Sequence, residues 1–425
     1  MTRTRTGLTQ PGLALLESSD STTGVMMTGV RALALLGLLL SQVSAGAAAV
    51  PAQPAGWSSF TQSFDALAAA DGIVGGAIVV VRDGRMAAHH EFGFADRDRG
   101  VRITPQTIYH YGSITKTLTA ISIMQLRDRG RLRLDDRITS YVPELRQVHD
   151  PFGSMDAVTL RMLMSHSAGF QNPTWPYKQG KSWEPFEPTT WNQLVAMMPY
   201  QEVAFAPGSR FSYSNPGFIY LARVIEQLSG DPWEVYVQKN IFNALGMSRS
   251  YFAATPYYLA ADRSHNYTRV RNEAGREVTL DNGTDFDPGI TMPNGGWNAP
   301  LGDLVTYLAF LTNATHGDSA TQQLYDTVLR HSTLTEMWQP LYPTGQDGSE
   351  VDEDSVGLSF FSVRRGQTTF VGHTGNQAGF RAFMFLNPGT GAAVVAAFNT
   401  DSDLPSVEHP SRYQRIRDAA LKLIE

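Results

Sequence analysis

Cysteine is absent from the chain, and this absence excludes disulfide bonds, zinc–thiolate sites and a cysteine nucleophile. Lysine is scarce, with five residues, and no basic stripe or basic tail is present. Together with the net charge of −6, this argues against a nucleic-acid-binding protein. Hydrophobic residues make up 42% of the 425 residues, so the chain can build a large core without covalent or metal staples.

Long apolar runs are also missing, apart from one stretch near the N-terminus. Arg31 precedes the apolar residues 32–40, and small residues follow them. This order is typical of a secretory signal peptide, which we expect over residues 1–49, with Met26 or Met27 as alternative starts. A competing interpretation is an uncleaved membrane anchor, although this apolar stretch is short for a span. We therefore expect an exported protein, either periplasmic or secreted.

Several familiar catalytic and ligand-binding motifs are missing as well. The chain has no His-Glu-x-x-His pair, no P-loop and no Gly-x-Ser-x-Gly elbow. The acidic run 281–287 lacks the glutamate that a calcium loop requires, and 350–354 is typical of a solvated loop. His89 and His90 are expected to face opposite sides of a strand, so they form a poor chelate. We expect neither a metal nor a cofactor.

Strand patterns lie at both ends of the chain, and helical patterns lie between them. The expected strands are 76–81, 86–93, 356–363, 368–371, 380–386 and 392–398. The expected helices are 113–129, 160–164, 217–228, 233–245, 302–312 and 408–424. Turn-forming residues predict long loops over 171–187, 256–300 and 342–354.

This order predicts an α+β fold. One lobe is an antiparallel sheet built from both chain ends and flanked by helices, and an all-α lobe is inserted beside it. Residues 50–64 are rich in Pro, Ala, Gly and Ser at their start, so we expect a flexible lead-in there. Residues 65–425 then form the main domain.

Ser113 and Lys116 form the pair that carries the most chemistry. They stand three residues apart at the start of an expected helix, so they share one helix face. A serine becomes a good nucleophile when a neighbouring base takes its proton, and a desolvated lysine can act as that base. No other lysine has a serine three residues before it. The alternative is an ordinary helix start, with Ser113 as its cap and Lys116 in solvent.

Two further clusters lie far downstream, Tyr-Ser-Asn at 213–215 and His-Thr-Gly at 373–375. In this order, Ser-x-x-Lys, Tyr-x-Asn and His-Thr-Gly resemble the motifs of the serine β-lactamase-related hydrolases. That family includes class C β-lactamases, D-alanyl-D-alanine carboxypeptidases, D-aminopeptidases and bacterial carboxylesterases. The resemblance covers about residues 65–425 and implies a β-lactamase/transpeptidase-like fold.

The resemblance implies a role for each residue of the proposed catalytic set. Ser113 would attack an acyl carbon and form an acyl-enzyme, and Lys116 would take or share its proton. Tyr213 would serve as a second base or as the acid that protonates the leaving group. For that task, a nearby cation such as Lys116 is expected to lower the pKa of the phenol.

Five further residues would bind the substrate by the same resemblance. Asn215 would hydrogen-bond the lysine and orient a substrate amide, and His373 and Thr374 would line the cleft. Gly375 would let the strand approach the substrate. The backbone N–H of Asn376 would complete an oxyanion hole with that of the serine.

His373 is the main departure from the family pattern. Many penicillin-recognising members have lysine at this position, which is a permanent cation for the β-lactam carboxylate. Histidine is charged only below about pH 6.5 unless its environment shifts the pKa. Near pH 7, two states of His373 therefore remain as alternatives: a charged imidazolium and a neutral ring that donates a hydrogen bond. The difference favours an esterase or amidase over an efficient β-lactamase.

The predicted substrates are esters, small amides or small peptides, including D-amino-acid peptides. One alternative is a β-lactamase or a D-alanyl-D-alanine carboxypeptidase. Another is a binding protein that senses peptidoglycan fragments or β-lactams without turning them over. Six aromatic side chains are candidates for the walls of the cleft, and simple packing is the alternative: Trp175, Tyr177, Trp183, Phe186, Trp191 and Trp297. The resemblance also implies that Gln171 or Asn172 contacts a substrate amide.

Overall fold

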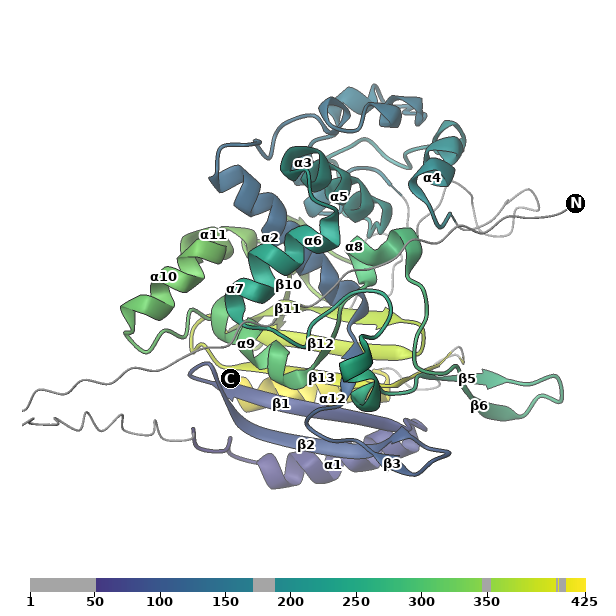
Figure 1. The fold of residues 1–425 in the computed structure, drawn as a ribbon, viewed down its shortest axis with the longest axis vertical. Helices are drawn as coiled ribbons and strands as arrows, with labels where there is room; N and C mark the ends of the chain where they lie inside the picture. Colours follow the sequence, from purple (N-terminus) through teal and green to yellow (C-terminus); the bar gives the residue numbers. More distant parts are fainter. Residues whose placement is uncertain (1–50, 171–187, 346–352, 403, 405–409) are drawn as a thin grey trace, which may run out of the picture. The chain divides into compact units, whose positions relative to one another are not determined.

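The computed structural model describes residues 51–170, 188–345, 353–402, 404 and 410–425. Their main feature is a nine-stranded sheet in the order β3-β2-β1-β13-β12-β11-β10-β9-β8, in which all neighbours are antiparallel (Figure 1). The strands are β1 (Gly75–Arg82), β2 (Arg85–Asp96), β3 (Val101–Arg102), β8 (Tyr342–Pro343), β9 (Ser355–Val356), β10 (Phe361–Arg365), β11 (Thr368–Gln377), β12 (Phe380–Leu386) and β13 (Ala393–Phe398). β1 pairs with β13, so the two ends of the chain meet in one sheet as predicted.

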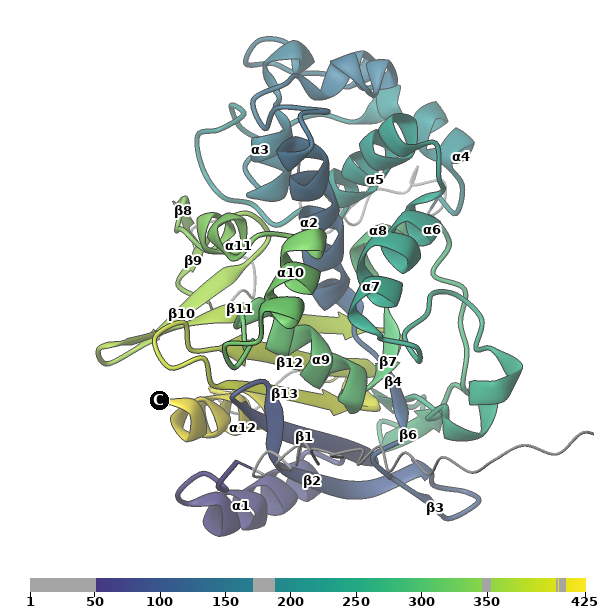
Figure 2. The ribbon, with the colours of Figure 1, turned by 60° about the vertical axis from the view of Figure 1, so that its left-hand side comes forward.

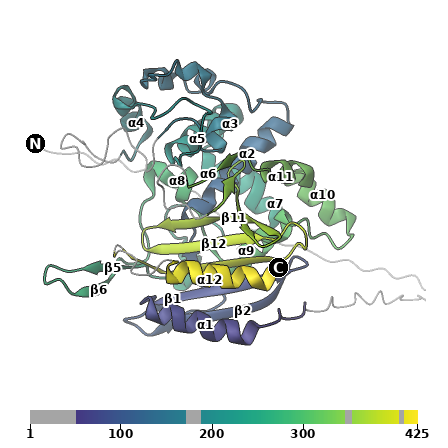
Figure 3. The same ribbon diagram turned by 180° about the vertical axis from the view of Figure 1, so that it is seen from behind.

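Helices cover both faces of this sheet. They are α1 (Trp57–Ala70), α2 (Thr115–Asp128), α3 (Leu160–Met164), α4 (Trp191–Met197), α5 (Pro216–Ser229), α6 (Trp233–Val237), α7 (Asn243–Leu245), α8 (Met292–Gly295), α9 (Leu301–Leu311), α10 (Ser319–Val328), α11 (His331–Met337) and α12 (Arg412–Leu421). Figure 3 shows α1 and α12 across one face, and Figure 1 shows α9 on the other. Alternation along β1 sends Ile78 and Val80 toward α1 and α12, and Val79 and Val81 toward the α9 side.

α1 replaces part of the predicted flexible lead-in. The expectation over 50–64 is wrong from Trp57 onward, because three aromatic side chains make one face of the helix apolar. Trp57, Phe60 and Phe64 are buried, and their spacing of three and four residues places them together on the sheet. The ring of Phe64 stacks on Phe398 of β13 with centroids 5.6 Å apart.

α2 is buried on all sides, although its sequence contains many polar residues. Every residue from Thr115 to Leu126 is buried. The hydroxyls of Thr117 and Thr119 donate to the carbonyls of Ile114 and Pro293, so these polar groups are satisfied inside the protein. Figure 2 shows α5, α6 and α8 beside α2, and the helical region above the sheet corresponds to the predicted all-α lobe.

The long loop predicted over 256–300 is wrong, because this segment contains regular structure. It forms the hairpin β5 (Tyr267–Arg271) and β6 (Glu277–Asp281), then α8 and β7 (Asn298–Pro300), which pairs with β4 (Ile108–His110). β14 (Thr400–Ser402) adds to β5 in parallel. Some of the Gly and Asn residues that suggested a loop lie in the hairpin turn, but Asn294 and Gly295 lie within α8 and Asn298 lies within β7.

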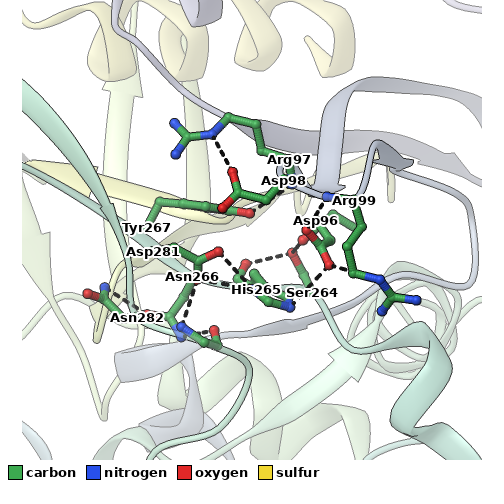
Figure 4. A network of polar contacts seen from close by, with 12 residues as sticks. Asp96, Arg97, Asp98, Arg99, Ser264, His265, Asn266, Tyr267, Asp281 and Asn282 are labelled. Carbon is green, nitrogen blue, oxygen red and sulfur yellow. Dashed lines mark hydrogen bonds and ion pairs between the residues drawn. The ribbon is translucent and has the colours of Figure 1, made fainter.

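A polar network fixes the base of this hairpin to the large sheet (Figure 4). Nδ1 of His265 lies 2.9 Å from Oδ2 of Asp281 at the end of β6. Nε2 of the same ring lies 3.4 Å from Oδ2 of Asp96 at the end of β2. The hydroxyl of Ser264 also donates to the Ala95 carbonyl at 3.3 Å. The base of the hairpin is thus held against the end of β2.

Other expected boundaries changed at irregular positions. The strand expected over 356–363 is divided into β9 and β10 at Ser359, whose φ is +71°. The strand expected over 368–371 continues as β11 to Gln377, so it includes the His-Thr-Gly motif. Within the described ranges, none of the helices has the length and apolar character needed to cross a membrane.

We expect the variant Phe64→Ala to lower the free energy of unfolding by about 3–5 kcal/mol, because it leaves a cavity between α1 and the sheet. Urea unfolding followed by circular dichroism measures this change. The control is Gln62→Ala, at an exposed position on the same helix, which should change stability by about 0.5 kcal/mol or less. Equal midpoints for the two variants would mean that α1 contributes little to the fold.

Candidate active site

Ser113 lies at a sharp turn between a strand and a long helix. β4 ends at His110, the 3₁₀ turn Gly112–Ile114 follows, and α2 begins at Thr115. We call Gly112–Ile114 the Ser113 turn. Lys116 stands on the first turn of α2, and its Nζ is 2.9 Å from Oγ of Ser113. Ser113 is partly exposed and Lys116 is fully buried, so the alternative of an ordinary helix start with a solvated lysine is wrong.

The surroundings of Lys116 favour its neutral form. Nζ also donates to the backbone carbonyl of Asn294 on α8 at 2.9 Å. It lies 4.9 Å from the centroid of the Tyr213 ring and 5.7 Å from that of Phe218. Burial lowers the pKa of Lys116 well below its usual value. A neutral amine with one lone pair next to Ser113 is suited to accept the hydroxyl proton.

Tyr213 completes the cluster from the loop that precedes α5, and its phenol hydrogen-bonds the side chain of Ser113. Burial raises the pKa of Tyr213 and outweighs this hydrogen bond. The expectation that Lys116 lowers this pKa is therefore wrong: the amine contacts the face of the ring, and burial disfavours the phenolate. A protonated phenol is suited to donate a proton rather than to accept one.

His166 supports Tyr213, although its sequence context assigns it no role. The two rings stack with centroids 4.4 Å apart and planes inclined by 22°. Nδ1 of His166 accepts the N–H of Ser214 at 3.0 Å, and its carbonyl accepts the N–H of Ser212 at 2.8 Å. Both neighbours of Tyr213 are thus fixed to the same residue. Burial lowers the pKa of His166 well below 6.5, so the stacked ring is neutral.

β11 passes the Ser113 turn so closely that two positions have no room for a side chain. A Cβ at Gly375 would lie 2.0 Å from the Tyr111 carbonyl oxygen and 3.4 Å from the Ser113 nitrogen. A Cβ at Gly112, where φ is +49°, would lie 2.9 Å from the Asn376 nitrogen. The backbone nitrogens of Ser113 and Asn376 therefore both lie at the contact between β11 and the Ser113 turn. An oxyanion hole requires two such backbone donors close together.

The end of β11 has one edge without a partner strand. β12 pairs with β11 as far as Gln377, but β10 pairs with it only as far as Gly372. Among the described strands, none covers the second edge from His373 to Gln377. Thr374 is partly exposed and Asn376 is exposed on this stretch. Such an edge offers backbone groups to an extended substrate.

His373 is buried and neutral. Its Nδ1 lies 2.5 Å from the carbonyl oxygen of Thr374, so Nδ1 carries the proton and donates it to this bond. Burial lowers the pKa of His373 to about 3. The imidazolium interpretation is therefore wrong, and Nε2 is left as an acceptor rather than the expected donor. Nε2 is buried and has no hydrogen-bond partner among the described residues.

The remaining predicted residues have different outcomes. Asn215 directly precedes α5 and is partly buried, and its bond to the lysine stays a prediction. Trp297 is fully buried in the core, so it is not a wall of the cleft. Trp191 is partly buried and packs against Tyr220 and Arg223. The other candidate cleft residues, Gln171, Asn172, Trp175, Tyr177, Trp183 and Phe186, lie outside the described residues.

Asn294 is a contact that the sequence patterns missed, because it acts through a backbone carbonyl. Only the fold that brings α8 against α2 places this carbonyl on the amine of Lys116. The part of the chain that the structure describes contains no candidate metal site, because no group of three or more His, Asp or Glu side chains there is arranged to hold a metal ion.

Comparison with known sequences gives matches over most of the chain. The sequence model of the family described as Beta-lactamase matches residues 60–420. Protein flp of Staphylococcus aureus (strain COL) is 24% identical over 339 residues, which is 79% of this chain and 62% of that protein. A Bacillus subtilis protein is 29% identical over 180 residues, or 42% of each chain. The chain thus spans less than two thirds of the length of these curated relatives.

Solved structures give the same result for the fold. The octameric penicillin-binding protein homologue from Pyrococcus abyssi has a TM-score of 0.68 at 25% identity, over 86% of this chain and 77% of that one. The D-amino acid amidase from Ochrobactrum anthropi SV3, complexed with L-phenylalanine, has a TM-score of 0.68 at 21% identity, over 86% and 98% of the two chains.

We expect Lys116→Met to reduce acylation by orders of magnitude and to change how stability depends on pH. The pKa of Lys116 is lowered in the folded state, so the unfolded chain binds more protons and wild-type stability rises with pH. The gain relative to Lys116→Met should approach about 1.4 kcal/mol per pH unit at most, and should end near the usual lysine pKa of about 10.4.

Urea unfolding at pH 7, 8.5 and 10, with both proteins side by side, measures this difference. The control is Lys239→Met, because Lys239 is exposed and paired with Asp231 on the surface. A wild-type advantage that stays constant over this range would show that the buried amine keeps an ordinary pKa.

Proposed function

Because the chain belongs to the beta-lactamase family of serine hydrolases, as its three motifs predicted, we propose that it hydrolyses esters or small amides through an acyl-enzyme on Ser113. The observation that carries this proposal is the 2.9 Å contact between Oγ of Ser113 and Nζ of a fully buried Lys116. A hydroxyl beside a desolvated amine is the arrangement that nucleophilic catalysis by serine requires.

The proposed reaction begins when Ser113 attacks the acyl carbon while its proton passes to the neutral amine of Lys116. The negative charge that develops on the substrate oxygen is stabilised by the N–H groups of Ser113 and Asn376. Tyr213 donates its proton to the leaving alcohol or amine as the bond to the acyl carbon breaks, and it regains a proton from Lys116. Water then cleaves the ester on Ser113 by the reverse sequence.

The state of His373 supports substrates without a carboxylate at this position. A buried, neutral ring that donates from Nδ1 to Thr374 supplies no positive charge to a substrate carboxylate. This favours neutral esters and amides over β-lactams and over peptides with a free C-terminus. The structural likeness to the D-amino acid amidase is consistent with small amides as substrates.

Two other functions are the alternatives that experiments on this site must distinguish from the proposed one. A β-lactamase or D-alanyl-D-alanine carboxypeptidase would act on substrates that carry a carboxylate, and a sensor would stay acylated.

We also propose that the protein is exported, on the basis of the apolar and small residues within 1–49. Export would place the site among small-molecule esters, amides and peptidoglycan fragments outside the cytoplasm.

We expect a fluorophosphonate probe to label the wild-type protein and Ser113→Ala to abolish the labelling. The matched control is Ser122→Ala, which removes a buried hydroxyl that donates to the Leu118 carbonyl on the same helix. An enzyme then releases p-nitrophenol from p-nitrophenyl esters with repeated turnover, whereas a sensor releases one equivalent. Labelling that persists in Ser113→Ala would refute the assigned nucleophile.

We expect His373→Lys to improve KM for nitrocefin, which carries a carboxylate, by about tenfold, the equivalent of one charge-assisted hydrogen bond. The KM for p-nitrophenyl acetate, which is neutral, should not improve. The control is His316→Lys, which adds the same charge at an exposed position. Equal effects of His373→Lys on the two substrates would contradict the role given to the residue at 373.

A further inference from the structure

A buried histidine lies directly behind the Ser113 turn, and neither the family motifs nor the proposed mechanism uses it. His110 is the last residue of β4, and 1% of it is exposed. Its Nδ1 lies 3.0 Å from Oδ1 of Asn298 on β7, and its Nε2 lies 3.2 Å from Oε1 of Gln377 at the end of β11. One ring therefore joins the strand before Ser113 to the strand that carries Asn376.

Gln377 makes the second half of this link. Its side chain lies against Gly295, where a Cβ would be 2.0 Å from Oε1 of Gln377. Its Nε2 donates to Oγ1 of Thr291 at 3.2 Å. Gly295 directly follows Asn294, whose carbonyl accepts a bond from Lys116. The Gln377 amide is thus wedged between β4 and the α8 segment that holds the catalytic amine.

The charge state of His110 fits a permanent tie rather than a proton carrier. Burial, reinforced by the charge of Arg263, lowers the pKa of His110 to about 4, so the ring is neutral with one N–H. A neutral ring has one N–H, and the Nε2–H tautomer donates it to Oε1 of Gln377, whose Nε2 donates in turn to Thr291. Nδ1 is then an acceptor, and the Asn298 amide satisfies it when its nitrogen faces the ring.

The position of this link matters because one edge of this end of β11 has no partner strand in the described part of the chain. β10 pairs with β11 only as far as Gly372, whereas β12 pairs with it along the other edge up to Gln377 and joins it through a turn at Ala378, whose φ is +49°. Within the described part of the chain, His110 and Thr291 provide the side-chain hydrogen bonds to this terminus. Asn376, the residue next to the link, supplies the second N–H of the proposed oxyanion hole.

We propose that His110 and Gln377 are positioning residues that hold the N–H of Asn376 opposite that of Ser113. This inference rests on the proposed acyl-enzyme function. Neither residue reacts with the substrate, and both act by fixing two backbone donors that belong to separate strands. Loss of the link lets the end of β11 shift away from the Ser113 turn, and shifts of about 1 Å at such a site cost about a hundredfold in rate.

The test is a double-mutant cycle on p-nitrophenyl ester hydrolysis with His110→Ala, Gln377→Ala and the double variant. We expect each single variant to lower kcat by about tenfold to a hundredfold with KM within about twofold. The double variant should be no worse than the poorer single variant. Phenylboronic acid, which mimics the tetrahedral intermediate, should lose affinity in parallel with kcat.

The control is Asn387→Ala, which breaks a buried amide bond to the Ile424 carbonyl between β12 and the C-terminus. It should lower the unfolding midpoint and leave kcat and boronate affinity unchanged. If His110→Ala does not fold, Gln377→Ala carries the test, because Gln377 is only partly buried. An unchanged kcat, or additive effects in the double variant, overturns the inference.

The behaviour of the wild-type protein distinguishes a failure of the positioning role from a failure of the proposed hydrolase function. If wild type hydrolyses the ester and both single variants match it, only the positioning role fails. If wild type is neither labelled by the fluorophosphonate probe nor active on any ester or amide, the proposed function fails first and the positioning role fails with it.

Discussion

The burial of a single amine governs the site. Lys116 lies on a helix whose residues from Thr115 to Leu126 are all buried, so the helix needs partners on every side. The sheet covers it at one end through the Ser113 turn, and α5, α6 and α8 cover it elsewhere. Desolvation by these elements lowers the pKa of the amine and favours the neutral form that the proposed base requires. The two-lobed architecture is therefore the condition for the chemistry.

The groups around this amine are all suited to a neutral or proton-donating state. His166 and His373 are neutral because they are buried, and burial likewise keeps the proton on Tyr213. A carboxylate in their place would raise the pKa of Lys116 and keep the amine protonated, so that it could not accept a proton. Such an assembly of desolvated polar groups costs stability, and proteins accept that cost where a reactive group must be held ready.

The fold was predictable where periodicity and turn residues agree. Alternation identified the central strands, and the helix after Ser113 ends as expected before Gly130, whose φ is +70°. The predicted secondary structure was wrong where the overall composition of a segment obscured its regular pattern of apolar residues. The aromatic residues of α1 were masked by neighbouring Ala, Ser and Gly residues. The Asn, Asp and Gly residues of 256–300 hid short strands, of which β5 pairs with β14 and β7 pairs with β4.

The sequence alone determined the residue types and their local geometry, because the i and i+3 spacing of a helix places Lys116 within reach of Ser113 wherever that helix lies. It also determined the order of the three motifs and therefore the family. The tertiary structure decided the proton on each group, the carbonyl of Asn294 on the amine and the tie between His110 and Gln377. These depend on burial and on contacts between segments more than a hundred residues apart, and neither burial nor such contacts are encoded in local spacing.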